Sequence, residues 1–191
     1  MKGILPDSKF HIDGKPAIIN GKNSKILDFW QTMFSRLESN TLRGKVGEYI
    51  VSWALSVDNR PQDPWQAFDL LSPNGKRIEV KTTSFVQDWE HGEENRTPKF
   101  VIKPTRNYTS DKGLAKDTSY NADIYVLCYY SWLDKKTTDV TNLNHWKFWV
   151  FSLKELLNIF DGHHSITVKK LESLGHRPVS AFDLGKSILS K

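Results

Sequence analysis

Apolar and polar residues alternate on both sides of a turn signal between residues 67 and 83, and this pattern predicts a β-hairpin. The expected arms are Ala67–Leu71 and Lys76–Thr83. In the connection between them, Pro73 suits the first central position of a type I turn, and Gly75 suits a residue with positive φ. The two residues together indicate a three-residue loop that ends in a left-handed glycine.

The loop length determines which side chains share a face of the hairpin. A three-residue loop places Ser72 opposite Lys76 and Asp69 opposite Glu79, and alternation along the strand adds Lys81 to the face of Glu79. The other face is then apolar and carries Phe68, Leu70, Ile78 and Val80. A two-residue turn would instead put the two carboxylates on opposite faces.

Two carboxylates that face each other across a hairpin repel, unless a cation lies between them. Asp69 and Glu79 therefore form a candidate site for a hard divalent cation, which binds one or two carboxylates and keeps several waters. The ammonium group of Lys81 is then placed to hold a water or a phosphate oxygen. The alternative is a solvated strand face on which these charges have no catalytic role.

Two amphipathic helices are expected before the hairpin, at about 25–37 and 42–57. Glu48 is expected on the polar side of the second helix, beside the small residues Gly44 and Ser52. Small neighbours permit the close approach of another element or a ligand, although a lone glutamate on such a face commonly points to solvent. The apolar stripe of the second helix is expected to comprise Leu42, Val46, Tyr49, Ile50, Trp53, Ala54 and Val57.

The chain after the hairpin alternates between apolar runs and polar connections. The apolar runs predict strands, and the run at 123–130 is continuous enough for a buried strand. A serine at position 152 and another at position 180 are expected to begin helices. The expected elements are a strand at 99–103, a polar loop at 105–120, strands at 123–130 and 146–151, a helix at 152–160, a short strand or turn around 166–168, and a final helix after Ser180.

Composition indicates a soluble globular protein rather than a disordered one, since 38% of the 191 residues are hydrophobic and 26% are charged. We expect a single domain with a basic leader at 1–23, a core at about 24–160 and an extension at 161–191. No segment suits a membrane span or a secretory signal. The single cysteine, Cys128, lies in an apolar run and is expected to pack inside a strand, in keeping with a cytoplasmic location.

The net charge of +5 and the pI of about 9.2 permit nucleic-acid binding without demonstrating it. Several cations follow the hairpin and are candidates for contacts with backbone phosphates. They are Lys99, Lys103, Arg106, Lys112 and Lys116. The alternative is that the polar loop that carries most of them is simply solvated.

The order of these charged residues resembles the PD-(D/E)XK nuclease superfamily. The matching pieces are Arg43–Glu48 on the leading helix, Phe68–Leu70 on one strand and Glu79–Lys81 on the next. The resemblance covers about Thr41 to Lys103, and more loosely the strand at 123–130. The aspartate follows phenylalanine where the family motif has proline. The resemblance implies a restriction-endonuclease-like α/β fold, in which helices flank a mixed β-sheet.

The resemblance also implies a Mg²⁺-dependent hydrolysis of phosphodiesters, with Mn²⁺ as an alternative metal. Asp69 and Glu79 would ligate the metal, and the main-chain carbonyl of Val80 would add a ligand. Lys81 would orient the attacking water or help to deprotonate it. Glu48 would bind a second metal or hold a metal-bound water.

The function implied is a DNA endonuclease, of a restriction or defence type because the chain holds extra loops beyond a minimal core, and those loops could read base edges. By analogy with restriction enzymes we expect a homodimer, and no membrane partner. One alternative is a repair or junction-resolving nuclease of the same fold. The others are a non-catalytic DNA-binding module and an ordinary α/β interaction protein.

Overall fold

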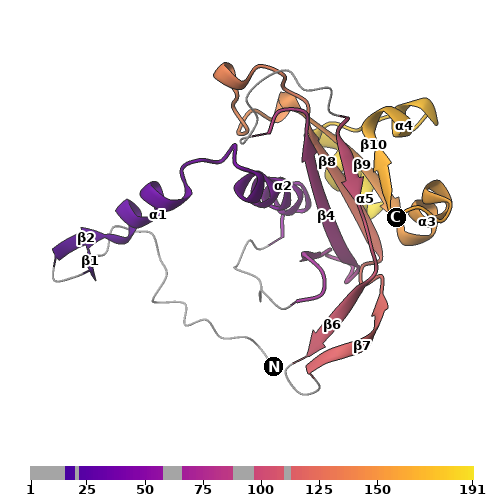
Figure 1. The fold of residues 1–191 in the computed structure, drawn as a ribbon, viewed down its shortest axis with the longest axis horizontal. Coiled ribbons are helices and arrows are strands. Elements are labelled where there is room, and N and C mark those ends of the chain that lie inside the picture. The colour runs from indigo at the N-terminus through magenta and orange to yellow at the C-terminus, as the bar shows by residue number, and fades with distance from the viewer. Residues whose placement is uncertain (1–15, 20–21, 58–65, 88–96, 110–112) are drawn as a thin grey trace. The chain divides into compact units, whose positions relative to one another are not determined.

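A computed structural model gives two units, residues 1–37 and residues 38–191, which are described separately. In the first unit, β1 (Pro16–Ile19) and β2 (Lys22–Lys25) pair antiparallel, and α1 (Ile26–Phe34) follows β2 directly (Figure 1). The residues that the structure describes are 16–19, 22–57, 66–87, 97–109 and 113–191.

A four-stranded mixed sheet forms the centre of the second unit, with the strand order β3-β4-β8-β9. Its strands are β3 (Leu70–Leu71), β4 (Arg77–Ser84), β8 (Ile124–Tyr130) and β9 (Trp146–Ser152). β4 and β8 run parallel, whereas the other two pairs are antiparallel. All seven residues of β8 are buried, as its continuous apolar run predicts.

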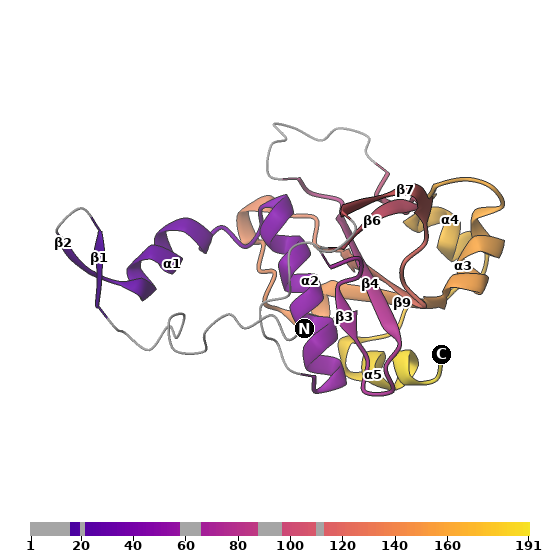
Figure 2. The ribbon, with the colours of Figure 1, turned by 90° about the horizontal axis from the view of Figure 1, so that it is seen from below.

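Helices lie on both sides of this sheet, so the predicted α/β class with a mixed, helix-flanked sheet is confirmed. Figure 2 shows α2 (Asn40–Leu55) on one side and α3 (Leu153–Phe160) with α4 (Val168–Ser173) on the other. The last helix, α5 (Ala181–Leu189), contacts both α2 and β9.

The core on the side of α3 and α4 includes a second, smaller sheet. Its strands β5 (Lys99–Val101) and β10 (Ser165–Thr167) pair antiparallel. Their inward side chains join those of the central sheet and of both helices in one buried cluster. Its most deeply buried members include Phe100, Leu127, Trp149, Leu156 and Leu171.

Two glycines let α2 approach its neighbours closely. A Cβ atom at Gly47 would clash with the hydroxyl of Thr82 on β4. A Cβ atom at Gly185 of α5 would clash with the main-chain carbonyl of Ala54 on α2. The helix that carries Glu48 is therefore seated directly against the strand that carries Glu79 and Lys81.

The predicted apolar stripe of α2 is partly wrong. Tyr49 and Trp53 are 59% and 45% exposed, and the ring of Trp53 contacts Phe182 of α5. The close contact with the sheet requires small side chains, so Gly47 and Ser52 lie on the buried side where larger apolar residues were expected. The buried residues of α2 are Arg43, Gly47, Ile50, Val51, Ser52 and Leu55.

The predicted polar loop at 105–120 is also wrong, because this segment forms a two-stranded ribbon. β6 (Thr105–Thr109) and β7 (Gly113–Ser119) pair antiparallel in a sheet of their own. The short 3-10 helices η1 (Lys135–Thr137) and η2 (Leu143–His145) occupy the polar connection before β9. The predicted helices after serines 152 and 180 are confirmed, and both serines cap them. Helix α4 was not expected.

Candidate active site

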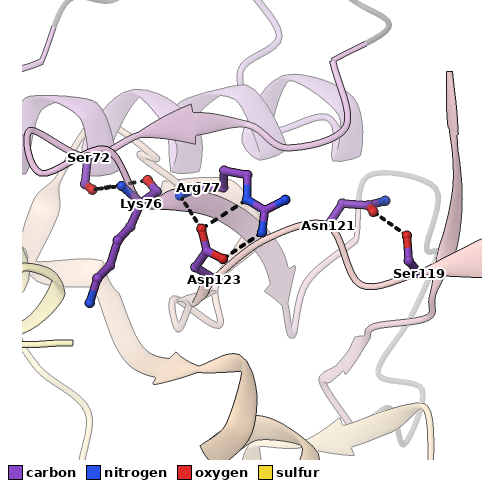
Figure 3. Close-up of polar contacts among 6 residues, drawn as sticks. All are labelled: Ser72, Lys76, Arg77, Ser119, Asn121 and Asp123. Carbon is purple, nitrogen blue, oxygen red and sulfur yellow. Dashed lines mark hydrogen bonds and ion pairs between the residues drawn. The ribbon is translucent and has the colours of Figure 1, made fainter. Parts of the chain in front are cut away.

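The hairpin that carries the candidate residues has the predicted loop and register. Gly75 has a φ of 80°, and its amide donates to the Ser72 carbonyl at 2.9 Å. The amide of Ser72 donates to the Lys76 carbonyl at 2.9 Å, and the Lys76 amide donates to the Ser72 hydroxyl at 2.9 Å (Figure 3). Leu70 pairs with Ile78, which confirms the register expected from a three-residue loop.

The carboxylate of Asp69 lies at the edge of β4, where it is bonded to the main chain, and its negative charge raises the pKa of Glu79. The shared face of the two carboxylates stays a prediction. β3 begins only at Leu70, and the Asp69 amide donates to the Ile78 carbonyl at 2.9 Å. The Asp69 Oδ2 atom then accepts the amide proton of Val80 at 2.7 Å. The carboxylate therefore takes the place of a main-chain acceptor beyond the end of the short strand, and it is held firmly against β4.

Glu79 and Lys81 lie on the face of β4 that borders a cleft, which is also lined by residues of β5 and of the ribbon. The Lys81 ammonium donates to Oε1 of Glu79 and forms an ion pair with it. The side chain of Lys81 is 35% exposed and that of Glu79 is 21% exposed, so solvent reaches both. In the register of the parallel pair, Glu79 lies beside Tyr125 and Lys81 beside Leu127.

Glu48 approaches the same strand from α2. Its carboxylate accepts hydrogen bonds from the Lys45 ammonium at 2.7 and 2.9 Å. The Glu48 side chain is 23% exposed, so it is not the fully solvated glutamate of the alternative interpretation. Because Gly47 lets α2 lie directly on β4, Glu48 is close enough for the charges of Asp69 and Lys81 to affect its pKa.

The three carboxylates form a concentration of negative charge. Burial raises the pKa of Glu79, and the negative charges of Asp69 and Glu48 raise it further, against the lowering effect of Lys81. Burial likewise raises the pKa of Glu48, and Asp69 adds to the increase, against the hydrogen bond from Lys45. A cation bound among these groups would relieve both the desolvation and the repulsion.

A cleft of about 200 Å³ opens directly on Glu79 and Lys81. Lys103, expected as a phosphate contact, lines this cleft. Asn121 and Tyr125 also line it, and they were not predicted as site residues. The complete lining is Ala67, Glu79, Lys81, Val101, Ile102, Lys103, Thr105, Ser119, Asn121 and Tyr125.

Tyr125 and Asn121 reach the cleft through contacts between segments that are distant in the sequence. No local sequence pattern therefore predicts them as site residues. Burial, and then the charge of Glu79, raises the pKa of Tyr125 to about 12, so its phenol stays protonated as a donor. Asn121 is 6% exposed, and its amide donates to the Thr105 hydroxyl at 3.0 Å. The only sequence signal for Asn121 is a polar residue placed just before a buried apolar run.

An ion pair at the start of the parallel strands holds β4 and β8 in register. The Arg77 guanidinium donates to Oδ2 and Oδ1 of Asp123 at 3.0 and 2.7 Å (Figure 3). The Arg77 amide also donates to Oδ2 at 2.9 Å, and the Asp123 amide donates back to the Arg77 carbonyl at 2.9 Å. The pair is exposed and adds little stability. The parallel pairing of β4 with β8 places Tyr125 beside Glu79.

The oxygen donors present fit a hard divalent cation. In the described parts of the chain, no group of three or more His, Cys, Asp and Glu side chains is placed to hold a metal. Mg²⁺ needs only one or two carboxylates when waters complete its shell. The Val80 amide points to Asp69, and the carbonyl of a strand residue points to the same side as its amide. Asp69, Glu79 and the Val80 carbonyl are therefore a plausible donor set.

The remaining cations predicted to bind nucleic acid are spread over three elements. Lys99 is exposed on β5, and Arg106 and Lys116 are exposed on the ribbon of β6 and β7. Lys112 lies outside the described residues. The buried thiol of Cys128 has a raised pKa through burial and is a packed strand residue, as predicted.

We expect Glu79→Gln to raise the melting temperature of the metal-free protein at neutral pH. The ordinary pKa of Glu is 4.5, and that of Glu79 is raised by burial and by Asp69. As the pH rises above 4.5, the unfolded chain loses this proton first, so the folded state is destabilised until the raised pKa is passed. The increase in melting temperature caused by Glu79→Gln should therefore be absent in acid and largest at neutral pH.

Glu155→Gln provides a control of opposite sign for this measurement. The hydrogen bond from Lys191 lowers the pKa of Glu155 to about 2, so its ionised form stabilises the folded protein. Glu155→Gln should lower the melting temperature at neutral pH, and the loss should disappear as the pH falls toward 2. A Glu79→Gln protein that melts below the wild type at neutral pH would contradict the electrostatic description of the site.

Comparisons with protein families, with curated proteins and with solved structures returned no match to this chain. The described part of the chain also contains no helix that is both long and apolar enough to cross a membrane. A function for this chain consequently follows from the geometry of the site itself.

Proposed function

We propose that the chain is a metal-dependent endonuclease of the PD-(D/E)XK superfamily, with a restriction-endonuclease-like fold. One observation carries the proposal. The Asp69 carboxylate is bonded to the Val80 amide, at the strand that presents Glu79 and Lys81 to one cleft. An ordinary surface would not hold two negatively charged carboxylates so close, since the charge of Asp69 disfavours the ionised form of Glu79.

Each residue has a distinct role in the proposed hydrolysis. Asp69, Glu79 and the Val80 carbonyl hold Mg²⁺, or Mn²⁺ in its place; when bound, the ion polarises the phosphate and lowers the pKa of water. Lys81 exchanges its contact with Glu79 for a phosphate oxygen and stabilises the charge that develops there. Glu48 orients the attacking water by accepting its hydrogen bond.

DNA is the proposed substrate. The chain has a net charge of +5, Lys103 lines the cleft, and Arg106 and Lys116 lie exposed beyond it. Lysines and arginines around a hydrolytic site attract and position a polyphosphate backbone. Four expectations stay predictions from the sequence. They are a restriction or defence role, a homodimeric state, a cytoplasmic location and a chain that forms a single domain.

A panel of nucleic acids tests this function. Wild-type protein and Lys81→Ala are incubated with duplex DNA, single-stranded DNA and RNA, each with Mg²⁺ and with EDTA. We expect wild-type cleavage of DNA in Mg²⁺ only, and a loss of about 100-fold or more for Lys81→Ala. Binding without cleavage would instead identify a non-catalytic DNA-binding module. Neither binding nor cleavage would contradict the proposed function.

A further inference from the structure

The ribbon of β6 and β7 stands out from the body of the second unit. It extends beyond the end of the central sheet in Figure 1. From Leu114 to Ser119, every residue of β7 is exposed. A two-stranded ribbon in isolation is marginally stable and buries little surface of its own. Such a projection therefore suits a partner more than a core.

The exposed side chains of the ribbon include two cations and an aromatic ring. Arg106 pairs with Thr118, and Tyr108 pairs with Leu114, and the register shifts between the two pairs. Arg106, Tyr108 and Lys116 are all exposed. The described part of the ribbon contains one acidic residue, Asp117, which is also exposed.

The base of the ribbon is fastened to the candidate active site. The buried side chain of Asn121 donates to the Thr105 hydroxyl at 3.0 Å and accepts from the Ser119 hydroxyl at 2.7 Å (Figure 3). Thr105 and Ser119 are paired neighbours at the start and the end of the ribbon. All three residues line the cleft that contains Glu79 and Lys81. A molecule bound to the ribbon would therefore lie next to this cleft.

We propose that the ribbon enters the major groove of duplex DNA, so that the substrate is double-stranded. This inference rests on the proposed function. Arg106 and Lys116 contact the phosphates that border the groove, while Tyr108 and Leu114 lie against the base edges. The major groove is about 12 Å wide and admits a two-stranded β-ribbon.

The composition of the ribbon favours a duplex over a single strand. Proteins that hold single strands without sequence preference stack successive bases on several aromatic side chains. Between residues 105 and 119 the sequence contains a single aromatic residue, Tyr108. One ring cannot provide a row of stacking platforms, whereas two exposed cations suit the rigid phosphate rows of a duplex.

Binding without cleavage tests this inference directly. The full chain in EDTA is titrated with a fluorescently labelled mixed-sequence duplex, and separately with one of its single strands, over a series of salt concentrations. The test variant is Arg106→Ala/Lys116→Ala. The control is Lys154→Ala/Lys169→Ala, which removes the same charge from the exposed surfaces of α3 and α4. Circular dichroism verifies that all proteins are folded.

We expect wild-type protein to bind the duplex at least about tenfold more tightly than the single strand. The ribbon variant should lose about tenfold or more in duplex affinity, and the slope of log affinity against log salt should fall by about two. The control should keep the wild-type slope. Equal losses in both variants, or equal affinity of the wild type for duplex and single strand, would overturn the ribbon proposal.

Parallel cleavage assays separate the two proposals. If wild-type protein cleaves DNA with Mg²⁺ and the ribbon variant binds duplex normally, the ribbon inference fails and the proposed function stands. If wild-type protein neither binds nor cleaves, both fail. Cleavage by the wild type together with selective loss of duplex binding in the ribbon variant supports both.

Discussion

Asp69→Asn is expected to reduce Mg²⁺-dependent DNA cleavage by about 100-fold or more, while the protein stays folded. The amide oxygen of asparagine can still accept the hydrogen bond of the Val80 amide, which the native carboxylate accepts at 2.7 Å. The hairpin should therefore keep its geometry. The negative charge that attracts the cation is lost, so affinity for Mg²⁺ or Mn²⁺ should fall as well. Single-turnover cleavage rates and a calorimetric Mn²⁺ titration measure the two effects.

A matched substitution elsewhere makes this result specific. Asp161 ends α3 with a φ of 45°, a left-handed conformation that asparagine also tolerates. Asp161→Asn should keep both cleavage and metal binding, because Asp161 is exposed and lies outside the cleft. An Asp69→Asn protein that cleaves at the wild-type rate would remove Asp69 from the catalytic site.

Gly185→Ala is expected to destabilise the protein by about 1–3 kcal/mol. The added methyl group would clash with the main-chain carbonyl of Ala54, which is part of α2 and cannot rotate away. Helices α2 and α5, which are in contact, would have to separate. Each kcal/mol should lower the melting temperature by about 2–4 °C in a chain of this size. Chemical denaturation gives the free energy of unfolding.

Gly44→Ala is the control for this substitution. Gly44 also lies inside a helix, but no atom lies within 4 Å of an added Cβ. The exchange should stabilise the protein by about 0.5–1 kcal/mol, since alanine is the better helix former. If both variants are stabilised alike, the close approach of α5 to Ala54 is not a feature of the folded protein.

The hairpin could be predicted from the sequence because its determinants are local. Pro73 and Gly75 select the loop, the loop determines the register, and the register pairs Leu70 with Ile78 as observed. The position of the Asp69 carboxylate could not be predicted in this way. It depends on β3 beginning only at Leu70, so that the Val80 amide has no main-chain partner on β3 and bonds to the Asp69 side chain instead.

Features that depend on distant segments were missed. The buried face of α2 follows from the close packing of Gly47 on Thr82, and no helical periodicity indicates that contact. Tyr125 enters the cleft because β8 pairs with β4 in parallel, a pairing between strands far apart in the sequence. The ribbon at 105–119 lacks the apolar alternation of a half-buried strand because both of its faces are largely exposed.

Cleavage of supercoiled plasmid DNA by the wild-type protein, with Mg²⁺ and with Mg²⁺ plus excess EDTA, tests the central claim most directly. In this proposal Asp69, Glu79 and the Val80 carbonyl hold a cation, and Lys81 stabilises the charge that develops on the phosphate during hydrolysis. We predict conversion of the plasmid to nicked or linear DNA in Mg²⁺ alone, and none with Lys81→Ala from the same preparation. Intact plasmid in Mg²⁺, from folded protein that also binds no Mn²⁺, would contradict the account.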